Sequence, residues 1–76
     1  MEADKIQKLR DLVKEGDICD SQGQYDKAIA AYDCALLIDP DAADAWFNKG
    51  LTLKKVGKHH EGTRCIEAAI NLYVGR

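Results

Sequence analysis

Apolar side chains recur along this chain at intervals of three and four residues, which is the period of an amphipathic helix. Over residues 3–22 the recurring apolar positions are Ile6, Leu9, Leu12, Val13 and Cys19, with Ile18 beside them. Polar side chains fill the opposite face of that segment. The same period returns over residues 25–38, 42–56 and 59–73. The pattern therefore predicts four helices.

Turn signals separate the four segments. Gly23 and Gly57 follow the first and third segments, where glycine supplies the left-handed conformation that commonly ends a helix. Pro40 prevents the second helix from continuing. Asp41 then offers a carboxylate to the free amides of the third helix, and we expect it to cap that helix. The four helices thus form two helix-turn-helix hairpins in tandem.

The second hairpin repeats the first at an offset of 34 residues. Ala35 is matched by Ala69, and the size and polarity of side chains are kept at nearly every position that the pattern places in the core. Gly16 and its match Gly50 lie inside helices, where glycine costs about 1 kcal/mol relative to alanine. We expect these two glycines to let the second helix of each hairpin approach the first closely.

This period resembles the tetratricopeptide repeat. The matching residues of the first copy are Gly16, Tyr25, Ala28, Tyr32, Ala35 and Pro40. Those of the second copy are Trp46, Gly50, Leu53, Ile66 and Ala69. The resemblance implies a single all-α domain over residues 1–76, built as two tandem hairpins of an α–α superhelix. Repeat one covers residues 9–42, with a helix extension from about residue 3, and repeat two covers residues 43–76.

Some residues depart from the family pattern. Gly62 stands where the family prefers alanine, and Val74 stands where it prefers proline. Gln24 and Lys58 occupy the position at which an aspartate often caps the second helix of a repeat. Lys58 places a positive charge at a helix N-terminus, which the helix dipole disfavours. We therefore expect the fourth helix to be the least stable element.

Length and composition indicate one small folded domain. The chain has 76 residues, of which 46% are hydrophobic and 32% are charged, a balance that excludes a disordered chain. No apolar run is long enough to span a bilayer, and the charged residues 1–5 lack the hydrophobic core of a secretion signal. We expect a cytoplasmic protein without a membrane partner.

Charge is unevenly distributed although the net charge is only −2. Residues 11–44 contain nine acidic and two basic side chains, whereas residues 45–76 contain two acidic and six basic ones. This polarity would steer self-association or partner choice, or it is an ordinary solvated surface. Cys19, Cys34 and Cys65 form no CxxC pair, so we expect buried or half-buried thiols rather than a disulfide or a zinc site.

The resemblance implies a protein–protein interaction module or small scaffold. In this family the first helices of successive repeats line a concave groove that holds a peptide of a partner. By position, the groove residues are Arg10, Val13, Asp17, Asp20, Asp44, Phe47, Asn48, Leu51 and Lys54. An apolar strip between charges suits an amphipathic segment. The family's clamp for the acidic C-terminus of a chaperone is not expected, because Val13 and Asp17 replace a lysine and an asparagine of that clamp.

Self-association is a second expectation. A solenoid of this type generally needs about three repeats or a capping helix to cover its terminal apolar face. Because neither follows residue 73, we expect a homo-oligomer formed through Ile66, Ile70 and Tyr73. The alternative within the same class is a monomer whose groove takes a client peptide.

An alternative from another class is a small metal-responsive protein, or one that contacts an anion or nucleic acid. It would use His59, His60 and Cys65 together with the basic cluster of residues 54–64. Adjacent histidines point about 100° apart on a helix, and the basic cluster lacks interleaved aromatic residues. No nucleophile elbow or phosphate loop is present. We therefore expect no catalysis, no cofactor, no metal and no nucleic acid.

Overall fold

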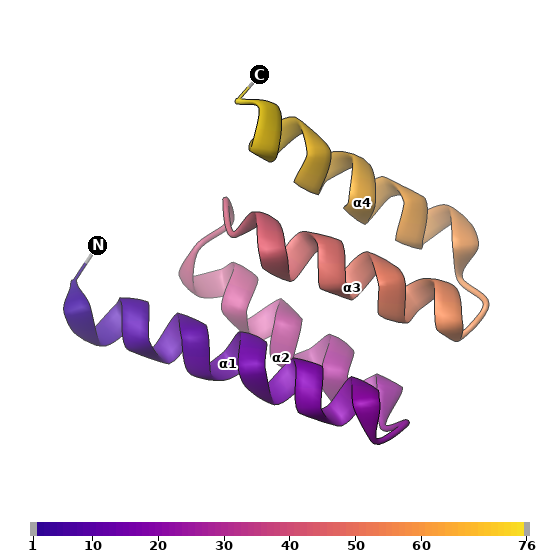
Figure 1. Ribbon diagram of the computed structural model, residues 1–76, viewed down its shortest axis with the longest axis horizontal. Coiled ribbons are helices and arrows are strands. Elements are labelled where there is room, and N and C mark those ends of the chain that lie inside the picture. The colour runs from indigo at the N-terminus through magenta and orange to yellow at the C-terminus, as the bar shows by residue number, and fades with distance from the viewer. Residues whose placement is uncertain (1, 76) are drawn as a thin grey trace.

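A computed structural model that describes residues 2–75 contains four helices (Figure 1). They are α1 (Ala3–Ser21), α2 (Tyr25–Ile38), α3 (Ala43–Lys55) and α4 (His59–Val74). The predicted all-α fold of two helical hairpins is confirmed, and every helix boundary lies within one residue of its predicted position. None of the described helices is long and apolar enough to cross a membrane.

The helices stack in chain order, and each hairpin packs on the next. α1 pairs with α2, α3 packs against α2 and touches α1, and α4 packs against α3 (Figure 1). Within residues 2–75, α4 has no other helix as a neighbour. One side of α4 is therefore left uncovered, whereas α2 is covered on both sides.

The two hairpin turns have the same geometry. Gly23 and Gly57 take φ values of 77° and 89°, which only glycine adopts without strain. The amide of Gln24 donates to the carbonyl of Cys19 over 2.8 Å. At the equivalent place the amide of Lys58 donates to the carbonyl of Leu53 over 2.9 Å. These bonds close the ends of α1 and α3 and fix the direction in which the next helix leaves.

The turn between the hairpins departs from the prediction. The N-cap of α3 is Ala42, and no side chain caps the helix. The expectation that Asp41 caps it was wrong, because α3 begins one residue later and Asp41 lies outside the N-cap position. Instead the amide of Asp41 donates to Asp39 Oδ1 over 3.0 Å, and Trp46 Nε1 donates to the Pro40 carbonyl over 2.8 Å.

The core is built mainly from small residues. Its buried hydrophobic side chains are Ala28, Ala31, Tyr32, Ala35, Ala45, Leu53, Cys65 and Ala69. Alanines at the contacts allow the helix backbones to approach, and the larger side chains fill the remaining space. Cys65 is buried and Cys19 is half-buried, as expected, but Cys34 is exposed, so the prediction for Cys34 was wrong.

Close approach at the helical glycines is confirmed. A Cβ atom on Gly16 would lie 2.5 Å from the Tyr32 ring. A Cβ atom on Gly50 would lie 2.7 Å from the carbonyl oxygen of Gly62, and one on Gly62 would lie 2.7 Å from the carbonyl oxygen of Gly50. The backbones of α3 and α4 therefore meet directly, which explains why glycine replaces the family's alanine at position 62.

Gly62→Ala restores the family's preferred residue, and we expect it to destabilise this chain. The added methyl group meets a backbone oxygen that cannot move aside, at a cost of about 1–3 kcal/mol. This exceeds the roughly 1 kcal/mol by which alanine is favoured over glycine in a helix. Urea denaturation measures the change. Asn71→Ala, at an exposed position of the same helix, is the control and should leave stability nearly unchanged. An equally stable Gly62→Ala protein would contradict the backbone contact.

Lys58→Asp should have the opposite effect. Lys58 is the N-cap of α4 and provides no capping bond. An aspartate there accepts from the free amides of the first turn and favours the positive end of the helix dipole, which adds about 0.5–1 kcal/mol to the free energy of unfolding. Lys58→Gln, which copies the uncapped Gln24 of the first repeat, should give a smaller gain. Thermal unfolding of the three proteins tests this, and a lower melting temperature for Lys58→Asp would refute it.

Candidate protein-interaction groove

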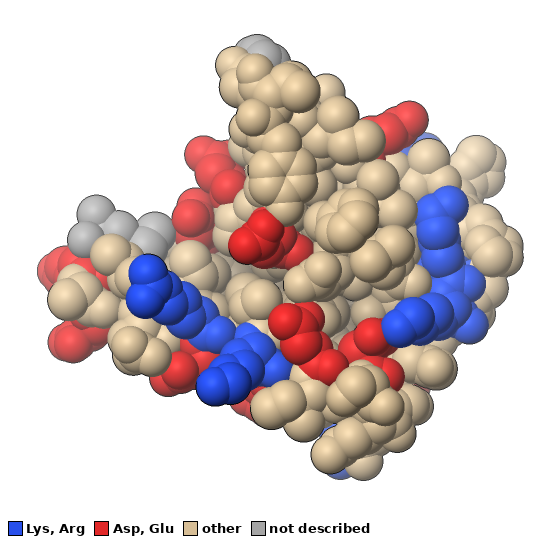
Figure 2. All heavy atoms as spheres, viewed as in Figure 1, with Lys and Arg blue, Asp and Glu red and all other residues tan. Residues whose placement is uncertain are grey.

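A hollow of about 500 Å³ is lined by residues of α1, the start of α3 and the end of α4. We call it the groove pocket, and its lining residues are Leu9, Arg10, Val13, Lys14, Asp17, Asp39, Ala42, Ala43, Asp44 and Tyr73. Aliphatic side chains line it from α1 and from the start of α3, and charged groups accompany them. Figure 2 shows this face of the molecule, with acidic side chains near the middle and basic ones toward both sides.

Asp17 joins three helices at the edge of the groove pocket. Its Oδ1 accepts a hydrogen bond from the Tyr32 hydroxyl on α2 over 2.5 Å, and another from Asn48 Nδ2 on α3 over 3.1 Å. Burial, and then the bond to Asp17, raise the pKa of Tyr32 far above its ordinary value. Hydrogen bonds that involve a charged group are stronger than neutral ones, so this site fixes α1 relative to α2 and α3.

Asp20 makes a second connection between the repeats one turn further along α1. Its Oδ1 accepts from the hydroxyl of the buried Thr52 over 2.9 Å, and its Oδ2 pairs with Lys55 Nζ over 2.6 Å. The bond to Asp20 raises the pKa of the exposed Lys55 ammonium. Asp17 and Asp20 were predicted to face a partner peptide. The structure gives both carboxylates bonding partners on α3, so they set the angle between α1 and α3.

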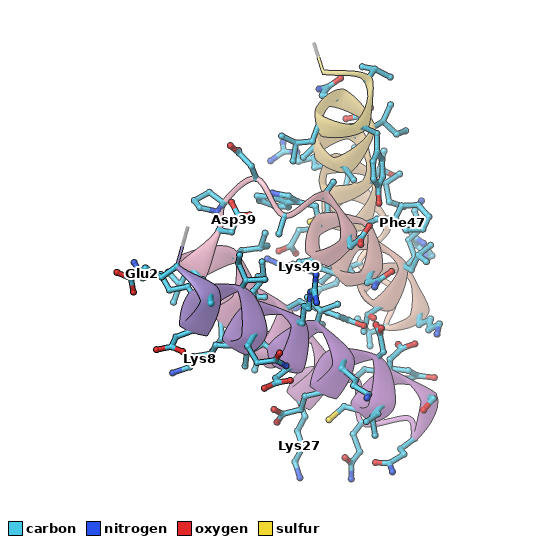
Figure 3. The ribbon with its side chains drawn as sticks, turned by 60° about the vertical axis from the view of Figure 1, so that its left-hand side comes forward. Glu2, Lys8, Lys27, Asp39, Phe47 and Lys49 are labelled. Atoms are coloured by element: carbon cyan, nitrogen blue, oxygen red, sulfur yellow. The ribbon has the colours of Figure 1, made fainter. Side chains whose placement is uncertain are left out.

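Apart from Asn48, which donates to Asp17, and Lys54, the other predicted groove residues fall into two groups. Arg10, Val13 and Asp44 line the groove pocket with Asp17. Phe47 and Leu51 lie further along α3, with 37% and 40% of their surface exposed, and Figure 3 shows Phe47 on the outer side of that helix. They extend the apolar surface beyond the pocket.

Lys54 is not brought together with these residues. Its Nζ donates to Thr63 Oγ1 on α4 over 3.0 Å. Its Cγ would also lie 2.8 Å from a Cβ atom on Gly62. The side chain therefore runs over the contact between α3 and α4. Position on the helix alone placed Lys54 in the groove, whereas the close approach of α4 draws it sideways.

Tyr73 lies at the groove, a role that the sequence did not indicate. Its hydroxyl donates to Asp44 Oδ1 over 2.5 Å, and this bond raises the pKa of Tyr73. The tyrosine thus brings the end of α4 to the start of α3. Sequence reasoning also missed Leu9 and Lys14, although each stands four residues from a predicted groove residue and so lies on the same helical face. Ala43 likewise stands four residues before Phe47, whereas Ala42 carries no such signal.

The residues predicted for self-association are separated by the fold. Ile66 is half-buried, and its Cγ1 would lie 2.7 Å from a Cβ atom on Gly50, so it packs against α3. Tyr73 turns toward the groove. Ile70 is 50% exposed, and the neighbouring Val74 is 72% exposed. Self-association stays a prediction, and the apolar surface available for it centres on Ile70.

The residues of the metal hypothesis are not gathered into a site. His59 and His60 are exposed at the start of α4, whereas Cys65 is buried against α3. Desolvation raises the pKa of the Cys65 thiol, which disfavours the thiolate form that binds metals. In the described part of the chain, no three His, Cys, Asp or Glu side chains are grouped to hold a metal ion.

Comparison with known proteins agrees with this architecture. The chain matches the family described as TPR repeat over residues 16–57, and the one described as Tetratricopeptide repeat over residues 43–73. The chain belongs to the tetratricopeptide repeat family. It is also similar to an uncharacterized protein of Methanocaldococcus jannaschii, with 32% identity over 62 residues that cover 82% of this chain and 72% of that protein. Tetratricopeptide repeat domains are generally protein–protein interaction modules and are usually not catalytic.

Replacing Tyr32 with phenylalanine tests the connection through Asp17. We expect the free energy of unfolding at neutral pH to fall by about 1.5–3 kcal/mol, because a hydrogen bond to a charged group is lost. The raised pKa of Tyr32 also means that above about pH 10 the unfolded chain releases a proton that the folded chain keeps. Wild-type stability should therefore fall as the pH rises above that value.

Tyr32→Phe lacks this phenol, so its stability should fall less steeply over the same pH range. Urea unfolding of both proteins between about pH 8 and pH 11 gives the two slopes. Equal slopes would show that Tyr32 ionises alike in the folded and unfolded chains.

Proposed function

We propose that this tetratricopeptide repeat protein binds a segment of a protein partner in the groove formed by α1 and α3. The observation that carries the proposal is the groove pocket, which combines an apolar lining with cationic side chains that belong to no ion pair within residues 2–75. Arg10 and Lys14 line it from one face of α1. The ion pairs within residues 2–75 are Lys49 with Asp33 and Lys55 with Asp20, and they leave both cations free for a ligand.

The pocket size indicates what such a segment inserts. A volume of about 500 Å³ falls within the usual range for ligand sites, which is large enough for one or two apolar side chains. Leu9 and Val13 would contact those side chains from α1, and Ala42 and Ala43 leave room for them at the start of α3. The small side chains of Ala42 and Ala43 are therefore part of what makes the site.

The charged side chains of the groove pocket indicate which residues should flank the apolar anchor of the bound segment. Arg10 and Lys14 stand on α1, and Asp39 and Asp44 stand across the pocket from them. A segment with an acidic residue beside its apolar anchor pairs with the α1 side, and a basic residue on the other flank pairs with the aspartates. Beyond the pocket, Phe47 offers an exposed aromatic ring to a longer peptide.

Selection of random displayed peptides on the purified protein tests this proposal. We expect the bound peptides to share an apolar residue with an acidic neighbour. Val13→Glu places a carboxylate inside the pocket and should weaken the selected peptides by at least about tenfold, as is usual for a central contact. Leu37→Glu is the matched control, because Leu37 is 83% exposed on α2 and lies outside the pocket, so binding should be unchanged.

Two results would contradict the proposal. One is peptides without any shared pattern. The other is equal affinity of a selected peptide for the wild-type protein and the Val13→Glu protein. Circular dichroism of each variant, compared with wild type, separates a loss of binding from a loss of folding.

A further inference from the structure

The outward side of α4 is the repeat equivalent of the surface on which α3 packs in the first hairpin. The offset of 34 residues matches Asp33 of α2 to Glu67 of α4, and Leu36 to Ile70. Leu36 is half-buried in the stack, whereas Ile70 is 50% exposed. We call the surface formed by Glu67, Ile70 and Val74 the outer face of α4. The contact between α2 and α3 indicates which side chains a helix would need in order to pack on this face.

The contact between α2 and α3 is held by one ion pair and one aromatic residue. Lys49 Nζ lies 2.6 Å from Asp33 Oδ1, and only 18% of the Lys49 side chain is exposed. The same ammonium lies 5.8 Å from the centroid of the Trp46 ring. Trp46 in turn donates to the carbonyl of Pro40 at the end of the first repeat. A helix that packs in this way carries a large apolar residue and, three positions later, a lysine.

Glu67 occupies the position in α4 that Asp33, the acceptor of Lys49, occupies in α2. Its side chain is exposed and belongs to neither ion pair within residues 2–75. Ile70 lies three residues further along the same helical face, and Val74, 72% exposed, continues it. The outer face of α4 therefore has an unpaired carboxylate beside an exposed apolar strip. It complements a helix that carries an apolar residue and, three positions later, a basic residue.

In the register of α3 on α2, a second copy of this chain does not supply the apolar and basic pair at the equivalent positions of its first helix. The helix of the first repeat that corresponds to α3 is α1, in which Leu12 matches Trp46 and Glu15 matches Lys49. Stacking one copy on another in the geometry of α3 on α2 would bring Glu15 against Glu67. Two carboxylates would then replace an ion pair, and like charges at a close contact oppose association. Without this repulsion, a head-to-tail contact of this type could add further copies without limit.

We propose that the outer face of α4 docks a partner helix that carries an apolar residue followed three positions later by lysine or arginine, and that Glu15 keeps a second copy of this chain off that face. The surface is separate from the groove and shares none of its lining residues, so the inference goes beyond peptide capture and does not depend on it.

The experiment converts α1 into the proposed docking helix. Glu15→Lys places a lysine three positions after Leu12, in the register of Trp46 and Lys49, and Glu15 is exposed, so the fold is retained. In place of the homo-oligomer predicted from the sequence, the repulsion between Glu15 and Glu67 leads us to expect a monomeric wild-type protein in analytical ultracentrifugation. We expect the Glu15→Lys protein to form head-to-tail oligomers. The dissociation constant for self-association of the Glu15→Lys protein should be at least about tenfold lower than that of wild type, because an ion pair replaces a repulsion. Added salt should weaken these oligomers.

A charge swap completes the test. Glu67→Lys alone should also associate, since the introduced ammonium then faces Glu15 of the next copy, and it keeps the test valid if Glu15→Lys fails to fold. The double variant Glu15→Lys, Glu67→Lys should return to the wild-type monomer. Asp41→Lys, in the exposed turn between the hairpins, makes the same charge change outside both surfaces and should behave as wild type.

Four results would overturn the proposal. In the first, wild type associates as strongly as the single variants. In the second, both single variants fold and remain monomeric. In the third, the double variant associates as they do. In the fourth, Asp41→Lys oligomerises as well, which would indicate a general effect of net charge. None of these measurements involves a groove peptide, so they do not bear on the proposed function.

Discussion

The hydrogen bond from Tyr32 to Asp17 is the interaction on which the arrangement of the repeats depends. The Tyr32 ring is 1% exposed and lies in the space that Gly16 leaves open, so its hydroxyl can reach α1. Asp17 then accepts a second bond from Asn48 across the repeat boundary. One carboxylate thereby sets both the packing inside the first hairpin and the position of α3. The groove pocket exists because α1 and α3 are held at that angle.

The second hairpin is stabilised differently although its sequence repeats the first. Ile66 matches Tyr32 and Leu51 matches Asp17, so no polar bond corresponds to the first one. Direct backbone contact between Gly50 and Gly62 takes its place. Packing of this kind depends on shape rather than on charge, and it tolerates no added methyl group. The same repeat pattern thus supports two different physical solutions, and substitutions taken from the family have different effects in each.

The two proposed interaction surfaces differ in what they require. The groove uses cations of α1 around an apolar hollow, and two acidic residues of α1, Asp17 and Asp20, are occupied in holding α1 to α3. The outer face of α4 uses one free carboxylate beside an apolar strip. The uneven charge along the chain therefore has a structural cause in the first repeat, where Asp17 and Asp20 bond to α3. In the second repeat, Glu67 belongs to neither ion pair of residues 2–75 and is left as an acceptor.

The sequence alone determined the four helices, their limits and the repeat, because helix period, glycine stops and proline breaks act over a few residues. It also indicated the close contacts at Gly16 and Gly50. Tertiary structure decided the roles of Asp17 and Asp20, whose partners on α3 lie 31–35 residues away, and it placed Tyr73 at the groove and Lys54 outside it. Such contacts depend on the angle between helices, and a periodic pattern specifies which face is apolar but not that angle.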